Sequence, residues 1–247
     1  VGMAYQGAGE EALSDISFTV NGGETIGIIG GTGSGKTSLV HLIPRFYDVT
    51  SGEILVDGVN VKEYDLEELY NKIGYISQKA VIFDGTVSSN VNFGKCKKKI
   101  TKKDIEEAIK LSEAEEFVLK MDDKYNEHIA SSGSNISGGQ KQRLAIARAL
   151  AKKAEIYIFD DSFSALDYKT DKNLRKELKK YTKDATSMIV AQRIGTIINA
   201  DKIVVLDKGE CVGIGTHQEL LVKSEAYKKE VALQELEKEV EGDLNER

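Results

Sequence analysis

Residues 30–37 have the types and spacing of a phosphate-binding loop. Their sequence, Gly-Gly-Thr-Gly-Ser-Gly-Lys-Thr, fits the pattern G-x-x-x-x-G-K-[ST]. Glycines lack the Cβ atoms that would keep a phosphate away from the backbone, so the N–H groups can bind anionic oxygens. Lys36 adds a positive charge for the terminal phosphates, and the Thr37 hydroxyl suits Mg²⁺. The pattern predicts nucleotide binding by Gly30, Gly31, Thr32, Gly33, Ser34, Gly35, Lys36, Thr37 and the adjoining Ser38.

Two further positions carry related chemistry. Asp160 ends a predicted buried strand at residues 155–160. A carboxylate at the end of a parallel strand next to the loop's own strand can bind Mg²⁺, directly or through water. Ser137 is a suitable N-cap for a predicted helix, and Gly138 and Gly139 leave the N-terminus of that helix open to an anion. The residues alone favour the simpler alternative for Ser137, an ordinary capped helix start.

The elements that must position these residues alternate between strands and helices, which predicts an α/β fold with a parallel sheet. The phosphate loop itself lies between a strand and a helix that stops near Pro44, which is the context the motif requires. Predicted strands cover residues 16–20, 24–29, 53–58, 73–78, 155–160, 187–190, 203–207 and 211–214, the last two as a hairpin. Predicted helices cover residues 38–43, 65–72, 102–111, 113–121, 138–152, 169–180, 217–222 and 225–240.

Composition narrows the class of protein. The chain has 247 residues, 40% of them apolar, and a net charge of −6, which does not suggest non-specific nucleic-acid binding. Cys96 and Cys211 lie far apart, which fits a reducing compartment and no disulfide framework. No apolar run reaches the length of about 18 residues that a membrane span needs. Because the chain begins at Val1 without Met, we expect a domain of a longer polypeptide, with N-terminal processing as the alternative.

With these motifs in order, the chain resembles the nucleotide-binding domain of ATP-binding cassette (ABC) transporters over essentially its whole length. Residues 136–140, Ile-Ser-Gly-Gly-Gln, look like the family's signature sequence, with Ile where Leu is usual. Gln78 matches the Q-loop glutamine, residues 164–167 match the D-loop, and Tyr5 falls where the family places an aromatic that stacks on adenine. Residues 81–94 are similar to exporter-type members, in which ATPase and permease are usually fused.

The resemblance implies an architecture. It comprises a P-loop NTPase core with a parallel sheet, an N-terminal antiparallel β subdomain and an inserted α-helical signature subdomain. We expect core and β subdomain at residues 1–78 and 150–215, the helical subdomain at 79–149, and C-terminal helices at 216–247. The domain would sit at the cytoplasmic face of the membrane, attached to a permease domain.

The resemblance also implies a mechanism. Two such domains face each other head to tail, and each ATP lies between one domain's phosphate loop and the other's signature helix. Mg²⁺ would be held by Thr37, Gln78 and Asp160. The residues expected to contact the partner's nucleotide are Ser137, Gly138, Gly139 and Gln140.

The resemblance implies four catalytic residues: Lys36, Gln78, Asp161 and Gln192. Two of them, Asp161 and Gln192, depart from the family pattern. Asp161 stands where the family has the glutamate that polarises the attacking water, and its carboxylate is one methylene shorter. Gln192 stands where the family has a histidine, and glutamine cannot become a cation. We therefore predict a degenerate site with slow hydrolysis, in a heterodimer whose partner has the intact residues.

Three alternatives stay open. The first is a homodimeric transporter ATPase in which Asp161 is an adequate base. The second is a soluble ABC ATPase outside transport; it would call for a long coiled-coil insertion or tandem cassettes, and no heptads are visible between Lys36 and Ser137. The third is a nucleotide-binding regulator without turnover.

Overall fold

The computed structural model describes residues 1–245, and the side chains of its last helix as far as Glu235. The chain divides into two compact units. The first unit comprises Val1–Tyr64 and the chain from Met188 onward, and the second unit comprises Asp65–Ser187. We describe each by itself.

The first unit is built on parallel strands that end at the phosphate loop. Strand β1 (Thr25–Ile29) pairs in parallel with β9 (Lys202–Asp207), with Ile26 opposite Lys202 and Ile29 opposite Val205. Strand β10 (Glu210–Gly215) pairs antiparallel with β9, so the predicted C-terminal hairpin is confirmed. Its other elements are α1 (Lys36–His41), the antiparallel pair β2 (Leu55–Val56) and β3 (Val59–Asn60), α8 (Ile194–Ile197), α9 (His217–Lys223) and α10 (Glu225–Asn245). Strand β8 (Thr186–Val190) spans the division between the units.

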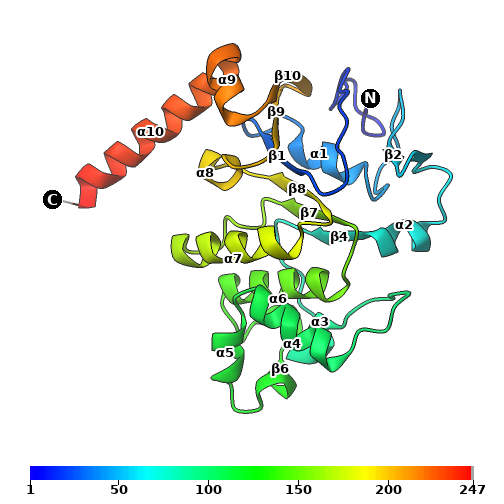
Figure 1. Ribbon diagram of the computed structural model, residues 1–247, viewed down its shortest axis with the longest axis vertical. Coiled ribbons are helices and arrows are strands. Elements are labelled where there is room, and N and C mark those ends of the chain that lie inside the picture. The colour runs from blue at the N-terminus through cyan, green and yellow to red at the C-terminus, as the bar shows by residue number, and fades with distance from the viewer. Residues whose placement is uncertain (246–247) are drawn as a thin grey trace. The chain divides into compact units, whose positions relative to one another are not determined.

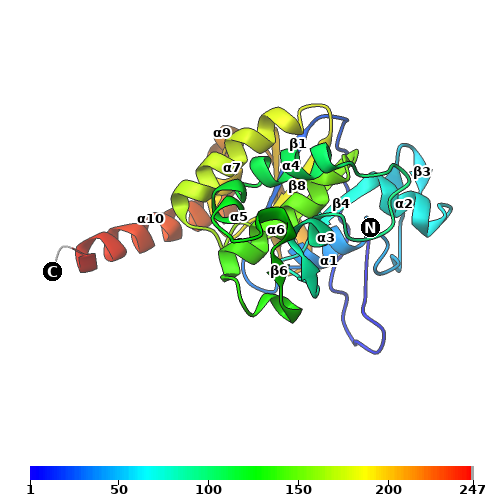
Figure 2. The same ribbon diagram turned by 90° about the horizontal axis from the view of Figure 1, so that it is seen from below.

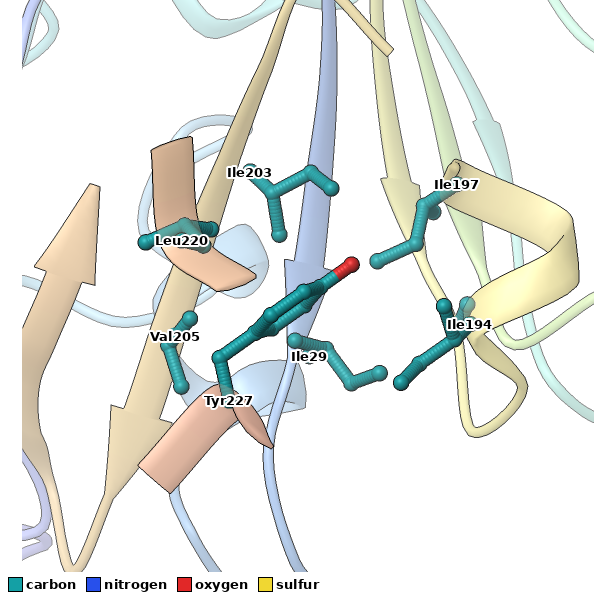
Figure 3. Packing of buried hydrophobic residues seen from close by; sticks show 8 residues of the cluster. Ile29, Ile194, Ile197, Ile203, Val205, Leu220 and Tyr227 are labelled. Carbon is teal, nitrogen blue, oxygen red and sulfur yellow. The ribbon is translucent and has the colours of Figure 1, made fainter. Parts of the chain in front are cut away.

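A buried apolar cluster holds the C-terminal helices of the first unit against these strands. Side chains from β1, α8, β9, α9 and α10 meet in it: Ile29, Ala191, Ile194, Ile197, Ile203, Val205, Leu220 and Tyr227. Figure 3 shows the Tyr227 ring among the aliphatic side chains of the cluster. Helix α9 packs against β10 and α10 follows it (Figure 1). The predicted C-terminal helices therefore belong to the fold of the first unit.

The second unit combines a parallel strand pair with a group of helices. Strands β4 (Ile73–Ile76) and β7 (Ile156–Asp160) pair in parallel, with Ile76 opposite Phe159. Helix α6 (Gly138–Ala151) packs against α3 (Val87–Val91) and α4 (Lys102–Leu111), as Figure 2 shows. The remaining elements are α2 (Leu66–Lys72), α5 (Glu115–Leu119), α7 (Tyr168–Tyr181), the pair β5 (Gly85–Thr86) and β6 (His128–Ile129), and 3₁₀ turns at Lys124–Asn126 and Ser131–Gly133. Parallel pairing in both units confirms the predicted α/β class.

One predicted strand is wrong, and several helix bounds differ from the prediction. Residues 16–20 form no ladder, although Ile16 exchanges hydrogen bonds with Val1 (Ile16 N to Val1 O, 3.0 Å; Val1 N to Ile16 O, 2.8 Å). Their alternation reflects one buried face, which an extended segment can have without a paired neighbour. Helix α1 begins at Lys36, inside the motif, and α5 is shorter than the predicted helix at 113–121. Among the described residues, no helix is long and apolar enough to cross a membrane.

Candidate functional site

The phosphate loop is a tight turn between β1 and α1. Gly33 and Gly35 have φ values of 79° and 97°, in the left-handed region that residues with a Cβ enter only with strain. A Cβ on Gly35 would lie 2.7 Å from Leu13 Cδ2, whereas one on Gly33 would meet no atom within 4 Å. Gly35 is thus required by packing, while Gly33 keeps the surface of the loop open to a ligand.

Lys36 and Ser34 present polar groups at this loop. The Lys36 ammonium donates to Gly30 O (2.6 Å) and Gly31 O (2.8 Å), so it lies over the start of the loop. The Ser34 side chain is 4% exposed, and its Oγ has no hydrogen-bond partner within the part of the chain that the structure describes. A buried hydroxyl without a partner is costly, and a bound oxygen ligand would relieve that cost.

A pocket of about 550 Å³ opens beside the loop. Residues 33–38 line it together with Tyr5, which the sequence predicted as an adenine-stacking residue. The Tyr5 hydroxyl lies 2.7 Å from Ser38 Oγ, and Tyr47 packs edge-on against the Tyr5 ring with centroids 5.1 Å apart. The first unit therefore brings Tyr5, Thr37 and Ser38 to one pocket with the phosphate loop.

The same pocket is lined by charged residues that the sequence reading did not select. Glu10 and Glu11 come from the loop after Tyr5, and Lys208 from the turn between β9 and β10. No motif marks these positions, and Lys208 is distant in sequence. Pairing of β9 with β1 and the hydrogen bond from Gly209 N to Ser34 O (3.1 Å) bring the Lys208 turn to the phosphate loop.

Gln192 follows β8 in an exposed loop of the first unit. The preceding residue, Ala191, donates its N–H to Ile28 O on β1 (3.0 Å). Gln192 O accepts from the Gln234 side chain of α10 (2.7 Å). Gln192 is thus attached to β1 on one side and to the C-terminal helix on the other.

Asp160 is a buried carboxylate at the end of β7 in the second unit. Its side chain is 2% exposed, and Oδ2 accepts from the Tyr75 hydroxyl on β4 (2.9 Å). Burial, together with the neighbouring Asp160 carboxylate, raises the pKa of Tyr75 above its ordinary value. Tyr75 therefore stays a neutral hydrogen-bond donor that orients Asp160. The sequence reading missed Tyr75, because nothing near it in the sequence marks it as a donor to Asp160.

Asp161 and Gln78 contact each other directly in the second unit. Gln78 Nε2 donates to Asp161 Oδ2 (3.0 Å). Asp161 has a φ of 48°, and its side chain is 8% exposed. Aspartate tolerates this left-handed conformation better than most residues with a Cβ. Two residues that the sequence assigned to catalysis, 83 positions apart, are thereby paired.

The signature segment begins α6 as predicted. Ser137 Oγ accepts from Gln140 N (3.3 Å), and Gln140 Oε1 accepts from Ser137 N (2.8 Å), which is a reciprocal capping box. Ser137 and Gly138 are exposed, and a Cβ on Gly139 would lie 3.3 Å from Ala165 O in the predicted D-loop. The helix start is therefore accessible at Ser137 and Gly138, and closely packed at Gly139.

Gln142 links the same helix to the Gln78 segment. Its side chain is 1% exposed, and Nε2 donates to Ser77 O (3.2 Å), one residue before Gln78. A buried amide held in this way couples the position of α6 to the end of β4. The sequence reading did not select Gln142, because one glutamine in a helix carries no local signal.

The candidate residues fall into two groups. Tyr5, residues 30–38 and Gln192 belong to the first unit, while Gln78, Asp160, Asp161 and residues 137–140 belong to the second. Within the described residues, no three His, Cys, Asp or Glu side chains are grouped to hold a metal ion.

Comparison with known proteins agrees with this arrangement. Residues 13–164 match the family model described as "ABC transporter". An uncharacterized ABC transporter ATP-binding protein from Mycobacterium tuberculosis is 44% identical over 241 residues, covering 97% of this chain and 41% of that protein. A putative multidrug export ATP-binding/permease protein from Bacillus subtilis is 40% identical over 236 residues, covering 96% of this chain and 40% of that protein.

Two further matches extend the comparison. An ATP-dependent lipid A-core flippase from Hahella chejuensis is 40% identical over 227 residues, covering 92% of this chain and 39% of the flippase. The solved structure of a bacterial Atm1-family ABC exporter with ATP bound superposes with a TM-score of 0.90 at 32% identity, covering 95% of this chain and 41% of that one. The chain thus spans about two-fifths of the length of the relatives it matches. This chain belongs to the ABC transporter family, as an ATP-binding domain of the exporter type.

Proposed function

We propose that this chain binds ATP at its phosphate loop and powers an exporter by ATP-driven, head-to-tail dimerisation with a second domain of its kind. The observation that carries the proposal is the loop itself. Gly33 and Gly35 hold left-handed conformations, the buried Ser34 hydroxyl lacks a partner among the described residues, and the Lys36 ammonium rests on loop carbonyls. Backbone N–H groups and a cation around open space suit a polyphosphate.

Each group then has a distinct part in binding. Lys36 would give up its contacts with Gly30 O and Gly31 O and bind phosphate oxygens instead. Its ammonium group, which can only donate, then keeps hydrogen-bond acceptors. Ser34 can donate its buried hydroxyl, and Tyr5, which lines the same pocket, can offer its ring to the base. The residues assigned to the nucleotide are those of the loop, Ser38 and Tyr5.

The proposed donors for Mg²⁺ are Thr37, Gln78 and Asp160. Hydroxyl, amide and carboxylate oxygens are the hard ligands that this ion prefers. The fit is supported in the second unit by Tyr75, which orients Asp160 through its hydroxyl, and by the Gln78 amide, which Asp161 orients. When bound, Mg²⁺ neutralises developing charge on the phosphates. The protein's contribution is to hold the Asp160 carboxylate in a fixed orientation.

We propose that hydrolysis at this chain's own site is slow. Asp161 would act as the base toward water, but its short carboxylate already accepts from Gln78. A displacement of about 1 Å in such a group can cost about a hundredfold in rate. Gln192 would hydrogen-bond to the γ-phosphate without supplying positive charge. Both deficits concern the chemical step, so ATP binding is retained.

The partner completes the assembly in this proposal. The exposed Ser137 and Gly138, with Gly139 and Gln140, would contact ATP held by a second nucleotide-binding domain, with intact glutamate and histidine. The relatives' names and the share of their length outside this chain support a fused transmembrane permease, with this domain at the cytoplasmic face of the membrane. Within this chain we propose a core and β subdomain at residues 1–78 and 150–215, a helical subdomain at 79–149 and C-terminal helices at 216–247, of which residues 246–247 lie outside the described part of the chain. A homodimer with normal turnover and a soluble ABC ATPase remain the competing functions.

Steady-state Mg-ATPase measurements over a protein concentration series test the proposal. The variants are the natural chain, Asp161→Glu/Gln192→His, and Lys36→Ala as the binding-deficient control. We expect turnover well below about 1 per second for the natural chain, against roughly 1–1000 per second for ordinary enzymes. We expect the double variant to gain tenfold or more, and more steeply at high protein concentration. Ordinary turnover of the natural chain would refute the degenerate site and favour the homodimer.

A further inference from the structure

The first half of α10 is docked beside the loop that carries Gln192. Tyr227 is fully buried in the apolar cluster, and Val231, one turn later, packs against that cluster. Ala191 and Ile194, on either side of the Gln192–Arg193 pair, are members of the same cluster. Figure 3 shows Tyr227 and Ile194 in this cluster, with Ile29 close to the Tyr227 ring. The helix and the loop are therefore parts of one packed structure.

Gln234 extends this contact with two backbone hydrogen bonds. Its Oε1 accepts from Ile194 N (2.8 Å), and its Nε2 donates to Gln192 O (2.7 Å). Spacings of four and three residues place Tyr227, Val231 and Gln234 on one face of the helix. The Gln234 side chain thus bonds the loop backbone as a neighbouring strand would, on both sides of Arg193.

The chemistry of the contact admits one orientation of the Gln234 amide. The Ile194 N–H can only donate and the Gln192 carbonyl can only accept, so oxygen must face the first and nitrogen the second. The second hydrogen of Nε2 is used as well, by Glu230 Oε1 (2.9 Å). Of the side chains that form helices well, only glutamine offers this acceptor and donor at this reach.

We propose that Gln234 is a positioning residue for Gln192, so that docking of α10 sets how Gln192 contacts the terminal phosphate of the nucleotide. The proposal rests on the proposed function, in which Gln192 meets the γ-phosphate. On one side, Ala191 is attached to β1, the strand that leads into the phosphate loop (Ala191 N to Ile28 O, 3.0 Å). On the other side, Gln234 fixes the Gln192 carbonyl and the Ile194 amide. Releasing the second attachment weakens the hold on the backbone around Gln192 while leaving the phosphate loop intact.

The first test needs no nucleotide. Gln234→Met keeps the length and helix propensity of the side chain and removes both hydrogen-bonding groups. Leu233→Met is the matched control, because Leu233 is 47% exposed on the same helix. Amide exchange is measured by NMR or mass spectrometry over the Ile194 region. We expect exchange at Ile194 to quicken about tenfold in Gln234→Met, as loss of one net hydrogen bond predicts, and to stay unchanged in the control. Equal exchange in both variants would overturn the proposal.

The second test measures binding of the terminal phosphate. Dissociation constants for Mg-ADP and for a hydrolysis-resistant Mg-ATP analogue are measured on the natural chain and on four variants: Gln234→Met, Leu233→Met, Gln192→Ala and Gln192→Ala/Gln234→Met. We expect Gln234→Met to weaken binding of the ATP analogue about three- to tenfold and to leave ADP binding unchanged. This is less than the loss of a whole hydrogen bond to a charged acceptor, because the Gln192 side chain is displaced and not removed. In the Gln192→Ala background, Gln234→Met should have no further effect on the ratio of the two dissociation constants.

The outcomes separate the two proposals. If the natural chain binds neither nucleotide, the proposed function fails. If it binds both and Gln234→Met changes neither constant, only the positioning role fails. If Gln234→Met lowers both affinities equally, or still shifts the ratio without the Gln192 side chain, Gln234 acts through general structure and the positioning role is refuted.

Discussion

Alanine at Gly33 and at Gly35 should have different effects, because the two glycines are needed for different reasons. Both have left-handed φ values, which cost a residue with a Cβ about 1–2 kcal/mol. Alanine also lowers the conformational entropy of the unfolded chain relative to glycine, which offsets about 0.4–1 kcal/mol of that cost. We therefore expect Gly33→Ala, whose Cβ meets no atom within 4 Å, to lower the free energy of unfolding by about 1 kcal/mol.

Gly35→Ala adds a collision to the same strain. Its Cβ would lie 2.7 Å from Leu13 Cδ2 and 3.1 Å from Ala12 O. The first of these is closer than carbon atoms approach, and overpacking of this kind costs about 1–3 kcal/mol. We expect a total loss of about 2–4 kcal/mol, so the two variants should differ by about 1–3 kcal/mol.

Urea denaturation followed by circular dichroism measures the difference, and nucleotide titration supplies the second reading. Gly22→Ala is the control, because a Cβ there meets nothing within 4 Å and its φ is not left-handed. Gly33→Ala should lose ATP affinity more than tenfold, since its Cβ occupies the open space assigned to phosphate, while Gly22→Ala binds normally. If Gly33→Ala proves as unstable as Gly35→Ala, the packing argument is wrong. If it binds ATP normally, the phosphate assignment is wrong.

Two other predictions concern stability in the first unit. Hydrogen bonds from Asn21, followed by those from Lys202, lower the pKa of Glu24 from 4.5 to about 2. The ionised Glu24 carboxylate therefore contributes its full stabilisation above pH 4.5 and loses it as the pH falls toward 2. Glu24→Gln should flatten the pH dependence of the denaturation midpoint in that window, and an unchanged slope would contradict this. Tyr227→Ala should cost about 3–5 kcal/mol through the cavity it leaves, whereas Tyr227→Phe, which removes only the 2.9 Å contact with His217 Nδ1, should cost about 1 kcal/mol by thermal unfolding. Similar losses in both Tyr227 variants would show that the hydroxyl, and not the ring, fixes α10.

Local sequence patterns predicted the elements whose causes are local. Asp65 caps α2 by accepting from Glu67 N and Glu68 N, and Ser137 caps α6 through Gln140. Such caps depend on residues within three or four positions, so they can be read from the sequence. The strand predicted at residues 16–20 failed because its alternation reports burial and not pairing.

Some residues of the candidate site could likewise be predicted from local patterns, and others could not. The phosphate loop and the acidic end of β7 carry motif patterns, and resemblance to the family added Tyr5, Gln78 and Gln192. Nothing local marks Tyr75 as the donor to Asp160, because the two are 85 positions apart. Their contact exists only because β4 and β7 pair in parallel.

The sequence by itself determined the α/β class, the phosphate loop and the capped helix start at Ser137, because each depends on residue type and short spacing. The signature sequence and the two departures at Asp161 and Gln192 came from its resemblance to the family. The tertiary structure alone decided which side chains hold those residues in place. Gln78 bonds Asp161, and Gln234 bonds the loop of Gln192 across 42 positions. These bonds form only when distant segments pack together, and the free energy of that packing comes from buried surface contributed by the whole unit, which no short pattern contains.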